Sequence, residues 1–132
     1  MDDFGDVVRR ARERAGLSQS EVARRAKITQ PYLSRVEGGG AEPPSQSVVA
    51  RIAAALGMPK LRLFIAAGIV PSEVEAAFFE SPELFAMLAN LSQRQRSAVY
   101  KSLKAHYPAQ IDRDAEEYDR WLRRLVRRVK SV

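Results

Sequence analysis

The sequence lacks cysteine altogether and contains a single histidine, His106. Without thiols the chain can form neither a disulfide nor a thiolate metal site, and this composition fits a reducing cytoplasm, where we expect the protein. One histidine offers no second imidazole to a metal ion and, with no cysteine, leaves no standard catalytic triad. We therefore predict no metal, no cofactor and no enzymatic activity of the chain's own.

Long apolar runs are also missing. No stretch of about 18 apolar residues occurs, so we expect no membrane-spanning helix. The opening residues MDDFGDVV lack the basic-then-apolar order of a secretory signal. The chain has 132 residues, of which 45% are hydrophobic, and a net charge of +6. That basic balance favours an anionic partner, nucleic acid before a membrane surface.

Apolar residues recur three or four positions apart through the first half of the chain, which is the period of amphipathic helices. Ser18 and Glu21 have the spacing of a capping box, Thr29 can cap the next helix, and glycines follow several of the apolar stripes. No segment of this half alternates apolar and polar residues as a strand does. We expect five short helices, at about residues 2–15, 18–26, 29–37, 45–56 and 61–68.

The third of these helices has two distinct faces when its residues are placed about 100° apart. Thr29, Leu33 and Val36 share one side, which we expect to face the core. Glu37 lies close to that side, and a carboxylate placed there needs a partner. The opposite side holds Pro31, Ser34 and Arg35, with Gln30 beside them and Tyr32 on the other flank. The helix therefore offers an amide, a hydroxyl and a guanidinium outward.

The second half of the chain continues the helical pattern. Pro71 and Ser81 precede short helices, and Ser92 with Gln95 has the spacing of a second capping box. We expect a last helix at about residues 109–130, with a coiled-coil-like apolar seam from Ile111 onward. We interpret this seam as packing on residues 84–103 and as a dimer surface. The expected dimer contacts are Tyr118, Trp121, Leu122, Leu125 and Val129.

Residues 7–56 carry a run of residue types at fixed offsets: Leu17-Ser18-Gln19, Glu21-Val22-Ala23, Ile28-Thr29, Tyr32 through Glu37, a glycine, and Pro43 before a further helix. With this run the segment resembles the lambda-repressor-like, Cro/CI-type (xenobiotic-response-element) helix-turn-helix family. The resemblance implies an all-α protein. Residues 1–68 would form a five-helix DNA-binding domain, and residues 69–132 a helical C-terminal oligomerisation and regulatory region.

The resemblance also implies roles for individual residues. In this family the second helix of the motif enters the DNA major groove. Carried over, the base-facing residues are Gln30, Pro31, Ser34 and Arg35. Thr29 would lie at the groove rim, Gln19 at a phosphate and Tyr32 at the sugar-phosphate backbone. Arg12 and Glu37 occupy the positions of an ion pair between the first and third helices.

Two features depart from the family pattern. Lys27 stands where the turn between the two helices of the motif usually has glycine, and a left-handed conformation would cost it about 1–2 kcal/mol. The loop after Glu37 usually brings basic residues to phosphate, whereas here it reads Gly-Gly-Gly-Ala-Glu. We expect backbone amides to replace those side chains and the affinity for DNA to be modest.

These observations predict a sequence-specific transcriptional regulator, in its simplest form a repressor that binds an inverted-repeat operator as a homodimer. Release from double-stranded DNA would then require an outside agent, such as a protease, an anti-repressor protein or a small ligand. Two alternatives remain open at this point. One is an antitoxin whose C-terminal helices hold a toxin while it regulates its own operon. The other is a protein-interaction module that keeps the fold without binding DNA.

Overall fold

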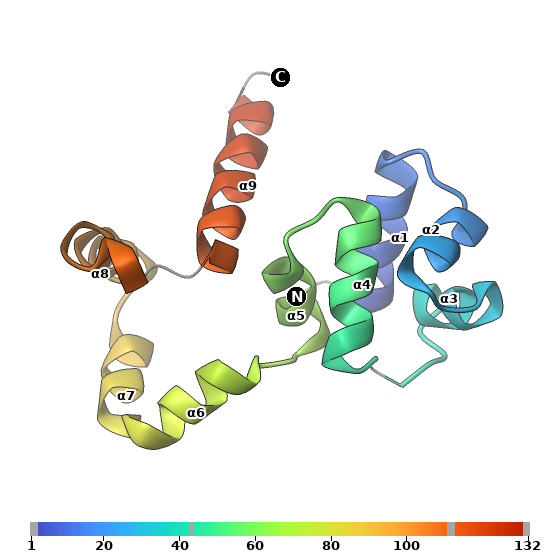
Figure 1. Cartoon of the computed structure of the whole chain (residues 1–132). Coiled ribbons are helices and arrows are strands. Elements are labelled where there is room, and N and C mark those ends of the chain that lie inside the picture. Colours follow the sequence, from blue (N-terminus) through green and yellow to red (C-terminus); the bar gives the residue numbers. More distant parts are fainter. Residues whose placement is uncertain (1–2, 43, 111–112, 131–132) are drawn as a thin grey trace.

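The computed structural model describes residues 3–42, 44–110 and 113–130, so that Pro43 and Ile111 lie outside it. Within these ranges every regular element is a helix, as predicted (Figure 1). The elements are α1 (Phe4–Arg14), α2 (Gln19–Ala26), α3 (Gln30–Glu37), α4 (Gln46–Leu56), α5 (Lys60–Ala67), α6 (Ser72–Glu80), α7 (Pro82–Asn90), α8 (Gln93–His106), the 3-10 turn η1 (Pro108–Gln110) and α9 (Arg113–Lys130).

Hydroxyl side chains begin several of these helices by accepting a hydrogen bond from an otherwise unsatisfied backbone N–H. Ser18 Oγ accepts from Glu21 N at 3.1 Å, and Thr29 Oγ1 accepts from Tyr32 N at 3.2 Å. At the start of α8 the capping box is complete, because Ser92 Oγ accepts from Gln95 N while Gln95 Oε1 accepts from Ser92 N. The helix starts predicted at these three positions are confirmed.

The prediction that the last helix begins near residue 109 is wrong. α8 ends at His106, and Tyr107 leaves the helical region with φ −129° and ψ 58°. Tyr107 precedes Pro108, whose ring disfavours the helical conformation for the residue before it. A 3-10 turn occupies Pro108–Gln110, closed by Gln110 N donating to Tyr107 O at 3.1 Å, and the described part of α9 is Arg113–Lys130.

The first five helices enclose one hydrophobic core. α2 and α5 pack against α4, while α1 lies against α3 and α5 (Figure 1). Each helix contributes apolar side chains from one stripe, which is why the periodicity of the sequence predicted the arrangement. The largest fully buried side chains are Val8, Val22, Leu33, Val49, Ile52 and Leu63.

Close packing of α1 on α3 depends on Gly5, which the sequence analysis overlooked. Gly5 is buried, and a β-carbon at this position would overlap the carbonyl oxygen of Val36 and lie 3.0 Å from that of Glu37. The missing side chain therefore lets the first turn of α1 approach the backbone at the end of α3. This approach brings Arg12, two turns further along α1, within reach of Glu37.

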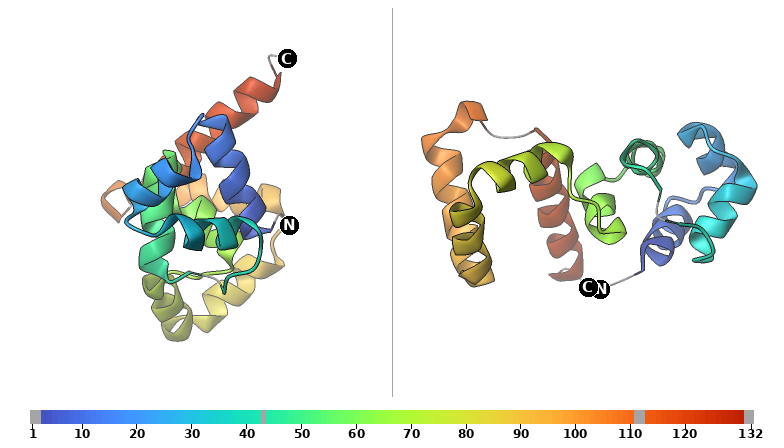
Figure 2. Two further views of the ribbon diagram at one scale, coloured as in Figure 1. Left: turned by 90° about the vertical axis from the view of Figure 1, so that its right-hand side faces the viewer. Right: turned by 90° about the horizontal axis from the view of Figure 1, so that it is seen from below.

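The later helices are arranged differently. α6 packs on α7, and the chain then returns through α8 so that α9 lies against α5 (Figures 1 and 2). An ion pair of 2.8 Å between Lys60 Nζ and Asp114 Oδ2 joins α5 to α9. None of the described residues beyond Gly68 is buried. A domain boundary between residues 68 and 69 stays a prediction.

Candidate nucleic-acid interface

A tight turn joins α2 to α3, and Lys27 forms its left-handed residue with φ 57° and ψ 43°. Lys27 N donates to Arg24 O at 3.3 Å and Ile28 N donates to Ala23 O at 2.9 Å, so the turn also satisfies the last carbonyl groups of α2. The left-handed conformation expected of Lys27 is confirmed. This backbone sets the direction in which α3 leaves α2.

α3 is anchored by one side and open on the others. Leu33 is fully buried and Val36 is 4% exposed, whereas Gln30, Pro31, Ser34 and Arg35 are exposed. Thr29 caps the helix and is exposed as well, so the expectation that it shares the core-facing side with Leu33 is wrong. The outward surface of α3 thus presents the polar set that periodicity selected.

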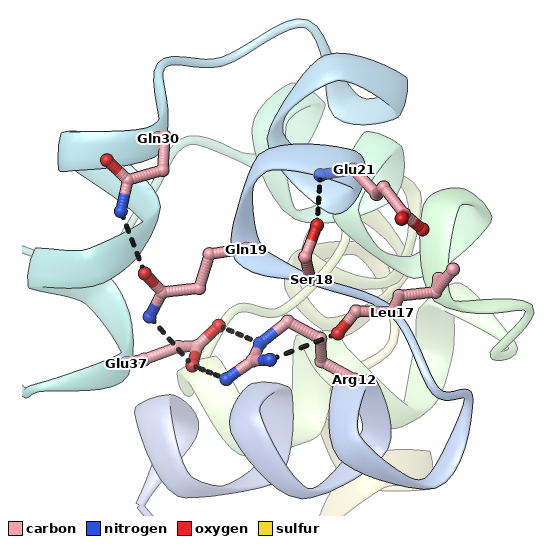
Figure 3. Close-up of polar contacts among 7 residues, drawn as sticks. All are labelled: Arg12, Leu17, Ser18, Gln19, Glu21, Gln30 and Glu37. Carbon is pink, nitrogen blue, oxygen red and sulfur yellow. Dashed lines mark hydrogen bonds and ion pairs between the residues drawn. The ribbon is translucent and has the colours of Figure 1, made fainter.

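Arg12 and Glu37 form a two-bond ion pair between α1 and α3 (Figure 3). Arg12 Nε and Nη2 donate to the two carboxylate oxygens of Glu37 at 2.8 Å each, and Arg12 Nη1 donates to Leu17 O at 3.1 Å. The carboxylate side chain is 4% exposed and the guanidinium side chain 15%. The hydrogen bond with Glu37 is the main cause that raises the pKa of Arg12. The pair fixes α1, the start of α2 and the end of α3 together.

Two glutamine amides continue from this ion pair to the exposed start of α3 (Figure 3). Gln19 Nε2 donates to Glu37 Oε1 at 3.3 Å, and Gln30 Nε2 donates to Gln19 Oε1 at 2.9 Å. A carboxylate only accepts hydrogen bonds, so the amino group of Gln19 faces it and the carbonyl oxygen of Gln19 faces Gln30. The buried acid therefore sets the orientation of both amides. Sequence reasoning treated these glutamines as separate contacts and missed the connection.

Tyr32 and Arg35 are also paired on the surface of α3. Tyr32 is half-buried, and the guanidinium carbon of Arg35 lies 5.8 Å from the centre of its ring. A guanidinium at this distance over an aromatic ring is attracted by the electrons of the ring face. The contact restricts the long Arg35 side chain while leaving it exposed.

The residues predicted for the dimer interface line two different hollows beside α9. Tyr118 and Leu122 line a groove between α8 and α9, together with Val126. Trp121 and Leu125 instead line a smaller hollow next to Gly57, at the end of α4. The side chain of Val129 lies outside the described residues.

Among the described residues, no group of three or more histidine, cysteine or acidic side chains is placed to hold a metal ion. In the same ranges no helix combines the length and the apolar character that crossing a bilayer requires.

Comparison with known proteins finds similarities to the N-terminal half of the chain. Residues 3–63 match the family model described as a helix-turn-helix domain. An uncharacterized HTH-type transcriptional regulator of Mycobacterium tuberculosis, present in strains H37Rv and CDC 1551, is 42% identical over 70 residues. Those residues make up 52% of this chain and 49% of the relative, so the chain spans about half the length of the curated relatives it matches.

Two solved structures are similar in part. The clp gene regulator ClgR from C. glutamicum is 29% identical, with 49% of this chain and 83% of that chain covered and a TM-score of 0.44. A complex of the SinR and SinI proteins gives 23% identity, with 76% and 94% covered and a TM-score of 0.46. Neither overlap carries an argument; the sequence match of residues 3–63 shows a similarity of the N-terminal part to helix-turn-helix domains.

Proposed function

We propose that the protein is a sequence-specific DNA-binding transcriptional regulator, and that it represses by occupying an inverted-repeat operator as a homodimer. The observation that carries the proposal is the surface of α3, where Gln30, Ser34 and Arg35 are exposed while Leu33 is buried in a helix-turn-helix domain. The relatives that match this half are described as transcriptional regulators, which supports the same function. In this proposal α3 enters the major groove.

Gln30 is the residue that we assign to adenine. One N–H of its amide is held by Gln19, which leaves the carbonyl oxygen and the second N–H for a base. Adenine presents N6–H and N7 in the major groove, and a glutamine amide matches this donor and acceptor pair. The hydrogen bonds from Glu37 through Gln19 fix the orientation of the Gln30 amide, so little orientational entropy is lost on binding.

Gln19 and Tyr32 are assigned to phosphates, which fix the position of the protein on the duplex. Gln19 is the first residue of α2 and keeps one amide N–H beyond its bond to Glu37. That N–H would act beside the unsatisfied backbone amides of the first turn of α2. Tyr32 would reach the backbone at the flank of α3, with Thr29 at the rim of the groove.

Arg35 is the residue that we assign to guanine, where a guanidinium can donate to both O6 and N7. Its position over Tyr32 keeps the head group near the groove-facing side before DNA arrives. Ser34 can pair with any base edge, and Pro31 adds an exposed apolar contact. The sequence preference of the protein should therefore depend on Gln30 and Arg35 above all.

A homodimer would place two α3 helices about 34–36 Å apart, one turn of DNA, over an inverted repeat. The helices after Gly68 support dimerisation because they expose large apolar side chains that a monomer leaves in water: Phe78, Phe79, Leu84, Met87, Leu122 and Val126. Regulation would then act on these helices, through a protease, an anti-repressor protein or another binding partner.

The test is selection of bound DNA from a random library, followed by footprinting of the selected sites. We expect an inverted repeat whose half-sites are one helical turn apart, and an affinity that falls steeply with salt. Arg35→Ala should weaken binding to the selected site by about 5- to 150-fold, which corresponds to about 1–3 kcal/mol, and should leave non-specific binding nearly unchanged.

The matched control is Arg94→Ala, which removes the same charge from an exposed position on α8. It should change the affinity by less than about twofold, because a charge remote from the duplex is screened at physiological salt. Equal losses for both variants would show that Arg35 contributes only its charge. An unchanged affinity of Arg35→Ala would remove it from the base contacts.

A further inference from the structure

The C-terminal helices present two exposed surfaces of opposite charge. The first is formed by α6 and α7, residues 72–90, which contain four glutamates and no lysine or arginine. Large apolar side chains stand among these acids, including Phe79 at 72% and Met87 at 67% exposure. We call this the acidic surface. Its apolar members are Val74, Phe78, Phe79, Leu84 and Met87.

The second surface is a groove of about 820 Å³ between α8 and α9, bordered by Leu61 of α5. Its apolar lining includes Leu122 and Val126, which are 40% and 46% exposed. We call it the basic groove because four cationic side chains line it: Arg96, Lys101, Arg123 and Arg127.

The acidic side chains of α8 and α9 are too few to neutralise the positive charge around the basic groove. α8 contains four lysines and arginines and no acid, and α9 contains seven against four acids. Asp119 lines the groove, but its carboxylate already lies 3.0 Å from Arg123 and 3.8 Å from Lys104. An occupant with exposed carboxylates around an apolar stripe would match this lining.

The acidic surface has that composition, and none of its side chains lines the groove of its own chain. It meets a lining residue through its backbone, where Leu88 O of α7 accepts a hydrogen bond of 3.3 Å from Arg96 Nη1. α6 packs on α7, α9 packs on α5, and no residue of α6 or α7 lines the groove. Figure 1 shows α6 and α7 below α8, and α9 above and to the right of α8. Each copy therefore offers one acidic surface and one basic groove that are both open.

We infer that the acidic surface of one copy docks into the basic groove of a second copy, and that the same contact is repeated in the opposite direction. This inference rests on the proposed homodimer and specifies its interface. In a two-fold symmetric dimer every contact occurs twice, so the acidic surface of each copy lies in the basic groove of the other. Phe79 and Met87 would enter the apolar lining near Leu122 and Val126, with the glutamates of α6 and α7 beside the four cations.

The inference also selects among the residues of the seam predicted on α9. Tyr118 and Leu122, which line the groove, would contact the second copy. Trp121 and Leu125, which lie beside Gly57, would remain within one copy and hold α9 on the N-terminal helices. A parallel seam of α9 against α9 would instead use all four.

The absence of cysteine from the chain allows a direct test by disulfide trapping. Two full-length variants are made, Phe79→Cys and Val126→Cys, and they are oxidised alone and as a mixture. A bond between residue 79 of one copy and residue 126 of another can form only in the mixture. We expect a covalent dimer in the mixture at five-fold or more the yield of either variant alone.

The control pairs Val126→Cys with Val70→Cys, which places a thiol at an apolar residue that is 57% exposed and belongs to neither surface. This mixture should give no more covalent dimer than the single variants. Equal trapping with Val70→Cys, or stronger trapping of Val126→Cys alone, would overturn the inference, the latter in favour of α9 against α9.

Sedimentation of the full chain without DNA gives an independent measurement. We expect a dimer at micromolar concentration and a dissociation constant raised at least tenfold by Phe79→Asp, which alters a side chain that the monomer leaves exposed. A separate variant that reverses charge in the groove, Arg123→Glu with Arg127→Glu, should also raise the dissociation constant of the dimer. A chain that is monomeric yet binds a half-site would overturn the inference and leave DNA reading intact. A dimer that selects no DNA would overturn the proposed function alone.

Discussion

Both halves of the chain are mainly helical, but their apolar side chains are buried in one half and exposed in the other. Before Gly68, Leu33, Ile52 and Leu63 are fully buried in a core that five short helices share. After Gly68, Phe79 is 72% exposed, Met87 is 67% exposed, and no described residue is buried. The same amphipathic pattern thus yields a closed core in one half and open surfaces in the other.

The difference lies in how many helices meet around each apolar stripe. α4 is packed by both α2 and α5, so its stripe is covered from two directions. α6 and α7 contact each other, and α9 has α5 on one side and the groove on another. Burying a leucine or phenylalanine side chain contributes about 1.5–3 kcal/mol. The first half obtains this within one chain, whereas the second half leaves much of its apolar surface exposed.

The largest effect should follow from separating the halves. A fragment of residues 1–68 should unfold cooperatively by calorimetry and remain monomeric in sedimentation, because its core is complete. Its affinity for the full inverted repeat should fall about 10²- to 10⁴-fold, since the two half-sites are then bound independently. A fragment that dimerises, or that binds as tightly as the full chain, would place the dimer contacts before Gly68.

A pair of leucine truncations compares the halves at single residues. Leu33→Ala should lower the free energy of unfolding by about 2–5 kcal/mol, because it opens a cavity in a fully buried position. Leu84→Ala removes the same atoms from a side chain that is 54% exposed and should cost less than about 0.5 kcal/mol at concentrations where the chain is monomeric. Urea unfolding of both variants at low concentration measures this contrast, and similar losses would contradict it.

Much of the closed half was predictable from local patterns. The helix period, the caps at Ser18 and Thr29, and the left-handed Lys27 follow from residue types a few positions apart. Gly5 was not predictable in this way, because its reason is a backbone 31 residues further along the chain, at Val36. The chain of hydrogen bonds from Glu37 through Gln19 to Gln30 likewise depends on how α2 and α3 meet.

The open half was harder to predict because its pattern has more than one solution. The seam on α9 has the spacing of a coiled coil, yet Tyr118 and Leu122 line a groove while Trp121 and Leu125 lie near Gly57. A sequence gives the direction of an apolar stripe along a helix, but not the number of neighbours that cover it. For the same reason the assignment of the dimer contacts remains a proposal.

Ion pairs provide the next comparison, with a smaller expected effect. Arg12→Ala leaves the carboxylate of Glu37 almost buried without its partner and should cost about 3 kcal/mol, the lower end of the range for such pairs, because Arg12 keeps 15% exposure. Arg123→Ala breaks a pair on α9 in which the arginine side chain is 60% exposed, and it should cost about 0–1 kcal/mol. Thermal unfolding of both variants tests this, and a large loss for Arg123→Ala would mean that α9 is tightly packed.

The loss of Arg12 should also lower the sequence specificity of DNA binding. Without Arg12, Gln19 is the side-chain partner that Glu37 keeps among the described residues, and the orientation of the amides of Gln19 and Gln30 is less constrained. Arg12→Lys keeps the charge but cannot donate two parallel hydrogen bonds. Discrimination at the adenine assigned to Gln30 should therefore decline in both variants, measured as the ratio of affinities for matched and mismatched sites.

The smallest expected effect is an increase in stability. Lys27→Gly relieves a left-handed conformation that costs a side chain about 1–2 kcal/mol, while glycine loses about 0.5–1 kcal/mol more in backbone entropy on folding. The balance should raise the free energy of unfolding by about 0.5–1 kcal/mol, which corresponds to about 2–8 °C in Tm for a domain of this size. Lys27→Ala removes the charge but keeps the β-carbon, so it should give no such gain. Equal stability of the two variants would mean that the left-handed turn between α2 and α3 carries no strain, and that the lysine is tolerated there without cost.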